Sequence, residues 1–355
     1  LPSFTALNAG TVPVTATITV APSFENGSVT CTGPSKSFTI IVNPTAQVNQ
    51  PAGQVVCNGG LQPAVPFTTS NSGGFTTYAW SNDNISIGLA AGGSGDLPSF
   101  TAVNTGSVPV TATITVTPSF ENGSVTCTGP PKTFTIIVNP TAQVNQPAGQ
   151  EICNGGTQPS VAFTTANSGG TTTYAWSNDN TAIGLAASGT GNLPAFSAVN
   201  NGNMPVVATI TVLPTFTNGS TGCPGPGKTF TITVNPTAQV NQPASHVVCN
   251  GGSQPAVPFA TANTGGTTTY AWTNDTPSIG LASSGTGDVP AFTALNSGTL
   301  PVTATITVTP AFSNGTVNCT GPSKSFTITV NPTAQVNQPA NQVICNGGLQ
   351  PAVPF

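Results

Sequence analysis

The chain has 355 residues and a formal net charge of −4, and only 3% of its residues are charged, with four lysines and no arginine. It therefore lacks the basic surface that binding to the phosphate backbone of a nucleic acid requires. No apolar run approaches the ~18 residues of a membrane-spanning helix, so no membrane span is expected in this segment.

A repeat of 96 residues organises the whole chain. Cys31, Cys127, Cys223 and Cys319 are 96 residues apart, and so are Cys57, Cys153, Cys249 and Cys345. A unit of this length is large enough to bury one small core. We place complete repeats at 44–139, 140–235 and 236–331, the C-terminal part of a repeat at 1–43 and the N-terminal part of another at 332–355. Because both ends fall inside a repeat, we expect the natural protein to be longer.

Within one repeat the hydrophobic pattern predicts only strands. In chain order, a weak candidate precedes Cys57 and is followed by Ala64–Thr69, Thr76–Ser81, Ser99–Val103, Val110–Val116 and Phe134–Val138. Apolar residues alternate with threonine in the last two candidates, which is typical of half-buried strands. Between them, Asn122-Gly123 predicts a type I′ hairpin turn with positive φ at both central residues. Short strands with frequent turns predict an antiparallel β-sandwich.

Proline marks the junctions between repeats. Val42-Asn43-Pro44-Thr45 recurs with prolines at Pro140, Pro236 and Pro332. Proline fixes φ and removes a backbone donor, so these junctions should be short and semi-rigid. We therefore expect an extended array of domains.

Several motifs together carry a family resemblance that covers the whole chain. They are Cys57-Asn58-Gly59, Trp80-Ser81-Asn82-Asp83, Ile87-Gly88-Leu89, Cys127-Thr128-Gly129, and Phe134-Thr135-Ile136 before Asn139-Pro140. With these motifs the repeat resembles the PKD-like, immunoglobulin-like domains of Bacteroidota surface proteins. The resemblance implies tandem arrays in cell-surface adhesins and gliding or filament proteins, commonly exported by the type IX secretion route. It implies no catalysis, and the chain departs from the PKD signature in having no Gly-Asp-Gly after the tryptophan strand.

Two cysteines per repeat in a secreted β-domain predict one disulfide per domain. We expect pairing within each repeat, as Cys57–Cys127, Cys153–Cys223 and Cys249–Cys319, with Cys31 and Cys345 paired to residues outside this segment. Pairing across a junction, as Cys31–Cys57, is the alternative. The strand Phe38–Val42 lies between those two cysteines and would hold them apart.

Aromatic pairs mark the expected core. Tyr78, Tyr174 and Tyr270 stand two residues before Trp80, Trp176 and Trp272, so both rings of each pair share one face of a strand. We interpret them as core residues of the sandwich. A platform on which sugars stack is the alternative.

Two other positions carry polar chemistry. Asp83, Asp179 and Asp275 recur as weak calcium candidates, whereas hydrogen bonds within turns are the simpler explanation. One lysine per repeat, as at Lys132, begins the last strand. It either guards a sheet edge or forms a Lys–Asn isopeptide bond.

These observations predict a structural protein of the extracellular space or cell surface. We expect no enzyme and no cofactor, because the repeats share no histidine that could act as a base. The main hypothesis is the stalk or shaft of a secreted adhesin or filament, with neighbouring repeats, and possibly other copies in a filament, as partners. The alternatives are a repeated weak glycan-binding or surface-binding module that acts by avidity, and a self-associating fibre subunit.

Overall fold

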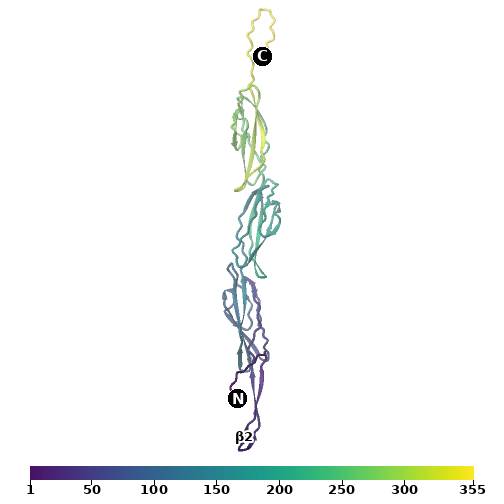
Figure 1. Ribbon diagram of the computed structural model, residues 1–355. Coiled ribbons are helices and arrows are strands. Elements are labelled where there is room, and N and C mark those ends of the chain that lie inside the picture. The colour runs from purple at the N-terminus through teal and green to yellow at the C-terminus, as the bar shows by residue number, and fades with distance from the viewer. The chain divides into compact units, whose positions relative to one another are not determined.

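The computed structural model describes residues 1–355, and β-strands form almost all of its regular structure (Figure 1). Three similar immunoglobulin-like domains follow one another along the chain, as the repeat predicts. The chain contains no helix that is long and apolar enough to cross a membrane.

The first complete domain shows the pattern of all three. Its elements are β5 (Gln54–Cys57), β6 (Leu61–Gln62), β7 (Phe75–Asn82), the 3-10 helix η1 (Ile85–Ile87), β8 (Gly92–Ser94), β9 (Phe100–Thr101), β10 (Val110–Asn122), β11 (Val125–Thr128) and β12 (Lys132–Asn139).

The second and third complete domains repeat this order. The second has β13 (Gln150–Cys153), β14 (Thr157–Gln158), β15 (Thr171–Asn178), η2 (Thr181–Ile183), β16 (Ser188–Thr190), β17 (Phe196–Ser197), β18 (Val206–Asn218), β19 (Thr221–Pro224) and β20 (Lys228–Asn235). The third has β21 (His246–Cys249), β22 (Ser253–Gln254), β23 (Thr267–Asn274), η3 (Pro277–Ile279), β24 (Ser284–Thr286), β25 (Phe292–Thr293), β26 (Val302–Ser313), β27 (Asn318–Thr320) and β28 (Lys324–Asn331).

Each domain has one large and one small sheet. In the first, the large sheet has the order β5-β12-β10-β7-β8, with β11 paired to β10, and the small sheet consists of β6 and β9. All its pairs are antiparallel except β5 and β12, which run parallel. The predicted strand Ala64–Thr69 is reduced to a single bridge between Val65 and Leu97. Two prolines flank Val65 in the sequence, and a proline nitrogen cannot donate to a ladder.

The hairpin turn differs from the expected type. Asn122 pairs with Val125, so Gly123 and Ser124 are the central residues. Gly123 has φ 67°, and no residue other than glycine has positive φ anywhere in the chain. A single glycine with positive φ at the first central position is the requirement of a type II′ turn, so the type I′ prediction is wrong.

The core lies between the large sheet and the segments that face it. Trp80 is 6% exposed and packs in one cluster with residues of β10, β12 and the Val65–Leu97 bridge, including Ile114, Ile136 and Leu97, which are fully buried. Trp176 and Trp272 are 5% and 3% exposed. Alternation of threonine with Val, Ala or Ile therefore buries one face of β10 and leaves the other partly exposed.

The tyrosines lie at the edge of this core. Tyr78 and Tyr270 are partly buried and pack against the clusters of their domains. The rings of Tyr78 and Phe67 meet edge to face with centroids 5.6 Å apart, and Tyr174 and Tyr270 make equivalent contacts to Phe163 and Phe259. These geometries are those that aromatic pairs favour.

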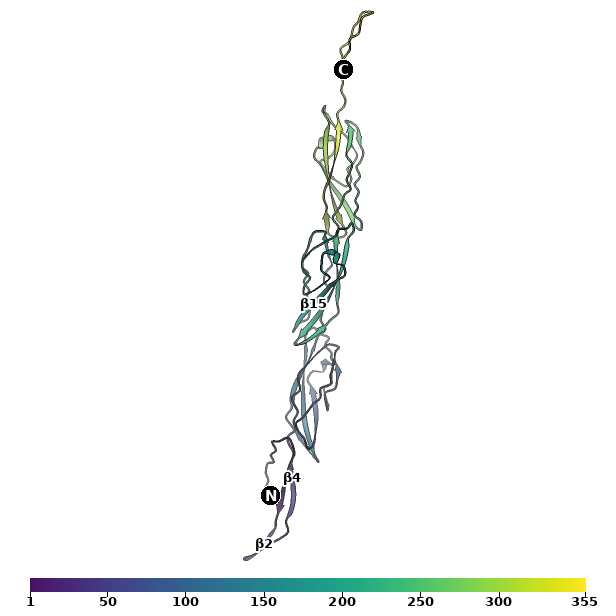
Figure 2. The same ribbon diagram turned by 90° about the vertical axis from the view of Figure 1, so that its right-hand side faces the viewer.

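The incomplete repeats keep only part of this structure. Residues 1–43 form β1 (Val14–Val20), which pairs with β4 (Lys36–Val42), and β2 (Ser23–Asn26), which pairs with β3 (Val29–Thr32) (Figure 2). Residues 332–355 contain no strand.

Two compact units divide the chain at the middle domain. The first consists of Leu1–Gln146, Phe163–Trp176 and Val212–Lys228. The second consists of Pro147–Ala162, Ser177–Thr211 and Thr229–Phe355. The middle domain therefore contributes strands to both units.

Replacing a core tryptophan tests the role of this position. We expect Trp80→Ala to lower the free energy of unfolding of its domain by ~3–5 kcal/mol, because it removes a buried aromatic side chain. Phe75→Thr is the control: Phe75 is 79% exposed, and Thr171 and Thr267 occupy its place in the other domains. Chemical denaturation followed by circular dichroism measures both. An unchanged unfolding curve for Trp80→Ala would contradict the core role.

Candidate functional site

Disulfides connect each domain to the next one along the chain. Cys57 of β5 is bonded to Cys223 of β19, and Cys153 of β13 is bonded to Cys319 of β27. The Cα atoms of each pair are 5.4 Å apart, and each bond closes a sequence separation of 166 residues. The first bond lies inside the first compact unit and the second inside the second. We call each such region, with its surrounding contacts, an interdomain joint.

The predicted pairs within repeats, Cys57–Cys127, Cys153–Cys223 and Cys249–Cys319, are therefore wrong. Cys57 lies beside Asn139, at the end of the sheet where Val110 pairs with Val138, whereas Cys127 lies opposite Phe120. Ten residues of β10 separate Val110 from Phe120, a distance of ~33 Å along a strand. A disulfide needs Cα atoms less than ~7 Å apart, so cysteines at opposite ends of one sheet cannot pair.

Four cysteines have no partner in this chain, namely Cys31, Cys127, Cys249 and Cys345. Two of them belong to hairpins and two to the first-strand position of a repeat. The alternative Cys31–Cys57 bond is not formed either.

A tight turn fixes Cys57 at the end of its domain. After the parallel pairing of Cys57 with Asn139, the backbone N–H of Asn58 donates to the Asn139 carbonyl at 2.8 Å. The Asn58 side chain donates to Thr141 Oγ1 at 2.9 Å and accepts from the backbone N–H of Asn104 at 2.8 Å. Asn58, the residue after the cysteine, is thus hydrogen-bonded to three parts of the chain, including the linker to the next domain.

The hairpin that carries Cys223 comes from the next domain. β18 runs for 13 residues, and its last part pairs with β19, with Phe216 opposite Cys223. Phe216 and Cys223 are both fully buried. The long hairpin therefore presents its cysteine, with its turn, to the end of the preceding domain.

Two asparagines form a second link beside the first disulfide. Asn139 Nδ2 donates to the Asn218 carbonyl at 3.5 Å, and Asn218 Nδ2 donates to Asn139 Oδ1 at 3.2 Å. Asn43 and Asn122 make the same reciprocal pair at 3.4 and 2.9 Å. Each pair joins the asparagine of a Val-Asn-Pro strand end to the asparagine of the next domain's Asn-Gly turn. The side-chain amide of asparagine both donates and accepts, so one pair can form two bonds.

At the second disulfide, a carboxylate replaces the asparagine pair. Glu151 Oε1 accepts from Asn235 Nδ2 at 2.8 Å, while Oε2 accepts from the backbone N–H and the hydroxyl of Thr316 at 3.0 and 3.3 Å. Desolvation acts to raise the pKa of Glu151, but the hydrogen bonds from Asn235 and Thr316 outweigh it and lower the pKa. Glu151 is unique to this repeat, because Val55 and Val247 stand at its place in the neighbours.

A third contact between neighbouring domains involves the loop that precedes β7, β15 or β23. The backbone N–H of Ser168 donates to the Ser107 carbonyl of the preceding domain at 3.0 Å, and Ser72 to Thr11 and Thr264 to Asn203 repeat this bond. Gly169 has φ 77°, and a Cβ built on it would lie 2.9 Å from Cδ of Pro109. Only glycine combines this backbone conformation with so close an approach. Each domain therefore meets its predecessor through a disulfide or asparagine contact and, separately, through this turn.

Loop closure gives the disulfides a large stabilising effect. A bond that closes about 166 residues lowers the entropy of the unfolded chain enough to stabilise the folded state by roughly 5 kcal/mol in the chain-entropy description. This is more than an asparagine pair, at about 1 kcal/mol per hydrogen bond, can contribute.

The aspartates predicted as weak calcium candidates accept hydrogen bonds across the fold. Oδ1 of Asp83, Asp179 and Asp275 accepts the backbone N–H of Thr113, Thr209 and Thr305 at 2.6, 2.6 and 2.8 Å. The bond from Thr305 lowers the pKa of Asp275. These partners are 30 residues away, so the bonds are not the local turn contacts that we expected. The chain holds no group of three or more His, Cys, Asp or Glu side chains that could bind a metal ion.

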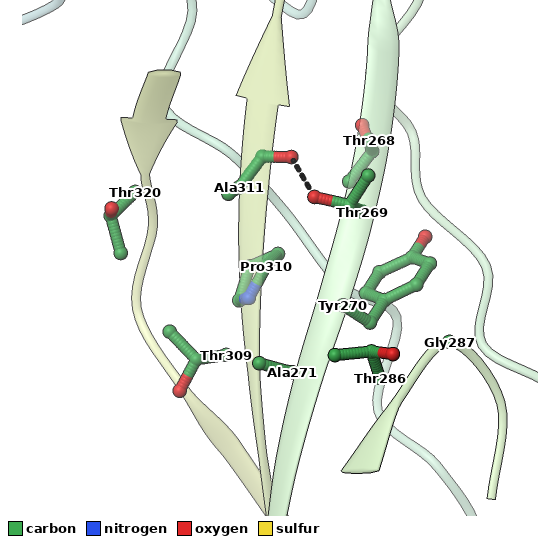
Figure 3. Close-up of a pocket in the computed structure, with 10 residues that line it drawn as sticks. All are labelled: Thr268, Thr269, Tyr270, Ala271, Thr286, Gly287, Thr309, Pro310, Ala311 and Thr320. Carbon is green, nitrogen blue, oxygen red and sulfur yellow. Dashed lines mark hydrogen bonds between the residues drawn. The ribbon is translucent and has the colours of Figure 1, made fainter.

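A surface hollow lies on the third domain, over β23, β26 and β27 (Figure 3). It has a volume of about 680 Å³, and half of its lining residues are threonines, with Tyr270 on one side. Thr269 Oγ1 donates to the Ala311 carbonyl at 3.4 Å. Tyr270 is its single titratable group, and desolvation, followed by the negative charge of Asp288, raises its pKa. The hollow can offer hydroxyl groups to a ligand but has no acid–base pair.

The sequence reasoning missed the joint residues other than cysteine. Asn139 and Asn218 had a sequence signal, because each repeat has an asparagine before its junction proline and another in its turn, whereas Glu151 has no counterpart in the neighbouring repeats. Their pairing depends on which sheet ends meet, and repeat spacing alone does not specify that.

No protein-family model matches the chain, and no curated protein matches it. Similar solved structures include the I9–I11 tandem of titin, with 11% identity, a TM-score of 0.28 and coverage of 81% of this chain and 100% of that one. Mouse cadherin-23 EC22–24 has 13% identity, a TM-score of 0.35 and coverage of 81% and 99%, and Drosophila N-cadherin EC1–4 has 15%, 0.29, and 90% and 84%. At these values the likeness carries no functional inference.

The chain is thus a tandem array of immunoglobulin-like β-sandwich domains whose neighbours are linked by disulfides.

Thiol counting distinguishes the observed pairing from pairing within repeats. We expect Cys57→Ser to add one titratable thiol to the unreduced chain unfolded in denaturant, because Cys223 loses its partner and denaturant exposes its buried thiol. Cys127→Ser should remove one, because Cys127 is already free. Ellman titration without reductant measures both variants. An added thiol in the Cys127→Ser variant would restore the pairing within repeats.

Acid should loosen the joint that contains Glu151. A lowered pKa means that the contribution of Glu151 is present at neutral pH and is lost as the pH falls through the lowered pKa, which lies below the ordinary range of a glutamate. We expect the amide of Thr316 to lose protection from hydrogen exchange at acidic pH, as measured by NMR protection factors. Glu151→Val, which introduces the residue of the neighbouring repeats, should abolish the pH dependence. The Asn122 turn has no carboxylate partner in its joint and serves as the internal control.

Proposed function

We propose that this chain is part of the stalk or shaft of a secreted cell-surface adhesin or extracellular filament protein, and that its domains carry mechanical load. The observation that supports this most directly is the overlap of the two disulfide loops. The loop closed by Cys57–Cys223 and the loop closed by Cys153–Cys319 share residues 153–223. A pulling force is therefore transmitted through covalent bonds that bypass much of the folded chain.

The joints suit this role because neighbours are attached at more than one place. A chain of domains tethered by linkers alone can bend at each linker, with a freedom that depends on linker composition. Here a disulfide, an asparagine or glutamate contact and a separate backbone hydrogen bond supplement the linker. Bending at a joint would strain several of these contacts together.

The disulfides also support an extracellular location. Disulfides persist in oxidising compartments and are rare in the cytosol. A charge-poor surface rich in threonine, serine and asparagine fits a secreted array in which hydroxyls and amides maintain solubility. The assignment to PKD-like repeats of Bacteroidota, exported by the type IX route, rests on the sequence motifs around Trp80 and Cys127.

A weak glycan-binding or surface-binding role, multiplied by avidity, is the second candidate. The threonine-lined hollow beside Tyr270 supports it, since its hydroxyls could bind a sugar. The buried tryptophans leave this hollow with one aromatic side chain, so we rank binding below load-bearing. We assign no catalytic role and no cofactor.

Stretching single molecules tests the load-bearing role. With both disulfides intact, the shortest covalent path from end to end passes through about 165 residues, so the fully stretched chain, at ~3.4 Å per residue, should reach about half its reduced length. Force spectroscopy with and without reductant measures this difference. The Cys31→Ser variant, which removes an unpaired thiol, should stretch like the unaltered chain. Equal final lengths in the two redox states would contradict the proposal.

A further inference from the structure

The hairpin turn at the second disulfide joint differs from its counterpart at the first. In the second domain Asn218 still pairs with the partner strand of the hairpin, and the glycine after it has φ 66°. In the third domain the pairing ends one position earlier, at Ser313, and Gly315 has φ 156°. Asn314 and Gly315 therefore lie in an open turn that the two strands do not hold.

Glu151 occupies the place where the turn asparagine would bind. Its Oε2 atom accepts the backbone N–H of Thr316, and a Cβ built on Gly315 would lie 2.6 Å from that oxygen. Asn235 Nδ2 donates to Glu151 Oε1, and Asn235 Oδ1 is buried without a partner. In the first joint, where a valine stands in place of Glu151, the turn asparagine donates to the equivalent oxygen. Asn314 forms no such bond.

This freedom sets Asn314 apart from the other asparagines that precede glycine. The complete domains contain seven such asparagines, and hydrogen bonds hold the side chains of five, namely Asn58, Asn122, Asn154, Asn218 and Asn250. The sixth, Asn201, is exposed, but the N–H of the following Gly202 donates to Asn200 Oδ1 at 2.9 Å. At the seventh, neither the exposed side chain of Asn314 nor the N–H of Gly315 has a hydrogen-bond partner.

We propose that Asn314 deamidates spontaneously, and faster than the other asparagines of the complete domains that precede glycine. The backbone nitrogen of Gly315 loses its proton and attacks Cγ of Asn314. A C–N bond forms and closes a five-membered succinimide ring, while the bond from Cγ to Nδ2 breaks and ammonia leaves. Water then opens the ring at either carbonyl, which leaves an aspartate or an isoaspartate at position 314. The net reaction consumes one water and releases one ammonia.

The turn favours both steps of this reaction. Ring closure brings the side-chain carbon to the next backbone nitrogen, and glycine hinders that approach least because it has no side chain. Water reaches the ring from a hollow of about 350 Å³ that Asn314, Thr316 and Glu151 line together. At Asn122 and Asn218 the same closure must first break a hydrogen bond of the side-chain amide.

Deamidation changes the contacts of the second joint. It places a second carboxylate in the hollow that contains Glu151, and like charges in one site repel each other. An isoaspartate also adds one carbon atom to the backbone of the turn. Both changes act against the hydrogen bonds from Thr316 to Glu151, while the Cys153–Cys319 disulfide remains. The joint therefore loosens slowly and irreversibly but stays covalently closed.

Incubation in water enriched in oxygen-18 tests the site. The folded, unreduced chain is kept in mildly alkaline buffer, and its proteolytic peptides are analysed by mass spectrometry at intervals. We expect one heavy oxygen per event at Asn314, and a rate severalfold higher there than at Asn122, Asn201 and Asn218. A rate at Asn314 that is no higher than the rates at these three would overturn the proposal.

Two variants separate the effect of the fold from that of the Asn-Gly sequence. Glu151→Val introduces the residue of the first joint and should lower the rate at Asn314 to that at Asn218, because the asparagine pair with Asn235 is restored. An unchanged rate in this variant would overturn the role of the open turn.

Asn314→Gln should convert far more slowly, because glutamine has to close a larger ring. In this variant the amide of Thr316 should keep its protection from hydrogen exchange at neutral pH on ageing, whereas the unaltered chain should lose it. Equal loss in both chains would overturn the effect on the joint. The load-bearing role does not depend on this reaction, so a negative result would leave that role untouched.

Discussion

Two cysteines can be joined only where the backbone brings their Cα atoms within about 7 Å, and this limit governs how the domains of this chain are connected. Within a domain, the two cysteines lie at opposite ends of the same large sheet, as Cys57 and Cys127 do. The distance is met only where one domain ends and the hairpin of the next begins. Because the two cysteines of a repeat lie at opposite ends of the sheet, each can pair only with a cysteine of a neighbouring repeat.

The remaining contacts of the joint depend on that arrangement. A hairpin held against the preceding domain buries the asparagine at the end of the last strand, and a buried amide is costly without hydrogen-bond partners. Asn139 finds its partner in the turn asparagine, and Asn235 finds it in Glu151. The two contacts differ in their response to pH, because the carboxylate of Glu151 can change its charge and the amides of the asparagines cannot.

Much of the fold could be predicted from the sequence, whereas the joint could not. Alternation of Val, Ile and Ala with threonine is a local property, so it located β10 and β12 and the buried face with Trp80. The pairing of cysteines depends instead on which strand ends meet in space. The distance argument that excluded Cys31–Cys57 also excludes Cys57–Cys127, but it could be applied only once the register of β5 with β12 was known. The parallel direction of β5 is what moves Cys57 to the far end of the domain.

Overlapping loops also change what a break in the polypeptide means. For any single peptide bond between Cys57 and Cys319, at least one disulfide spans the break, and between Cys153 and Cys223 both do. A protease that cut one exposed loop would leave the two fragments covalently attached. A single backbone cut in this region therefore leaves the protein covalently continuous. The same cut would separate the fragments of an array whose domains are joined by the backbone alone.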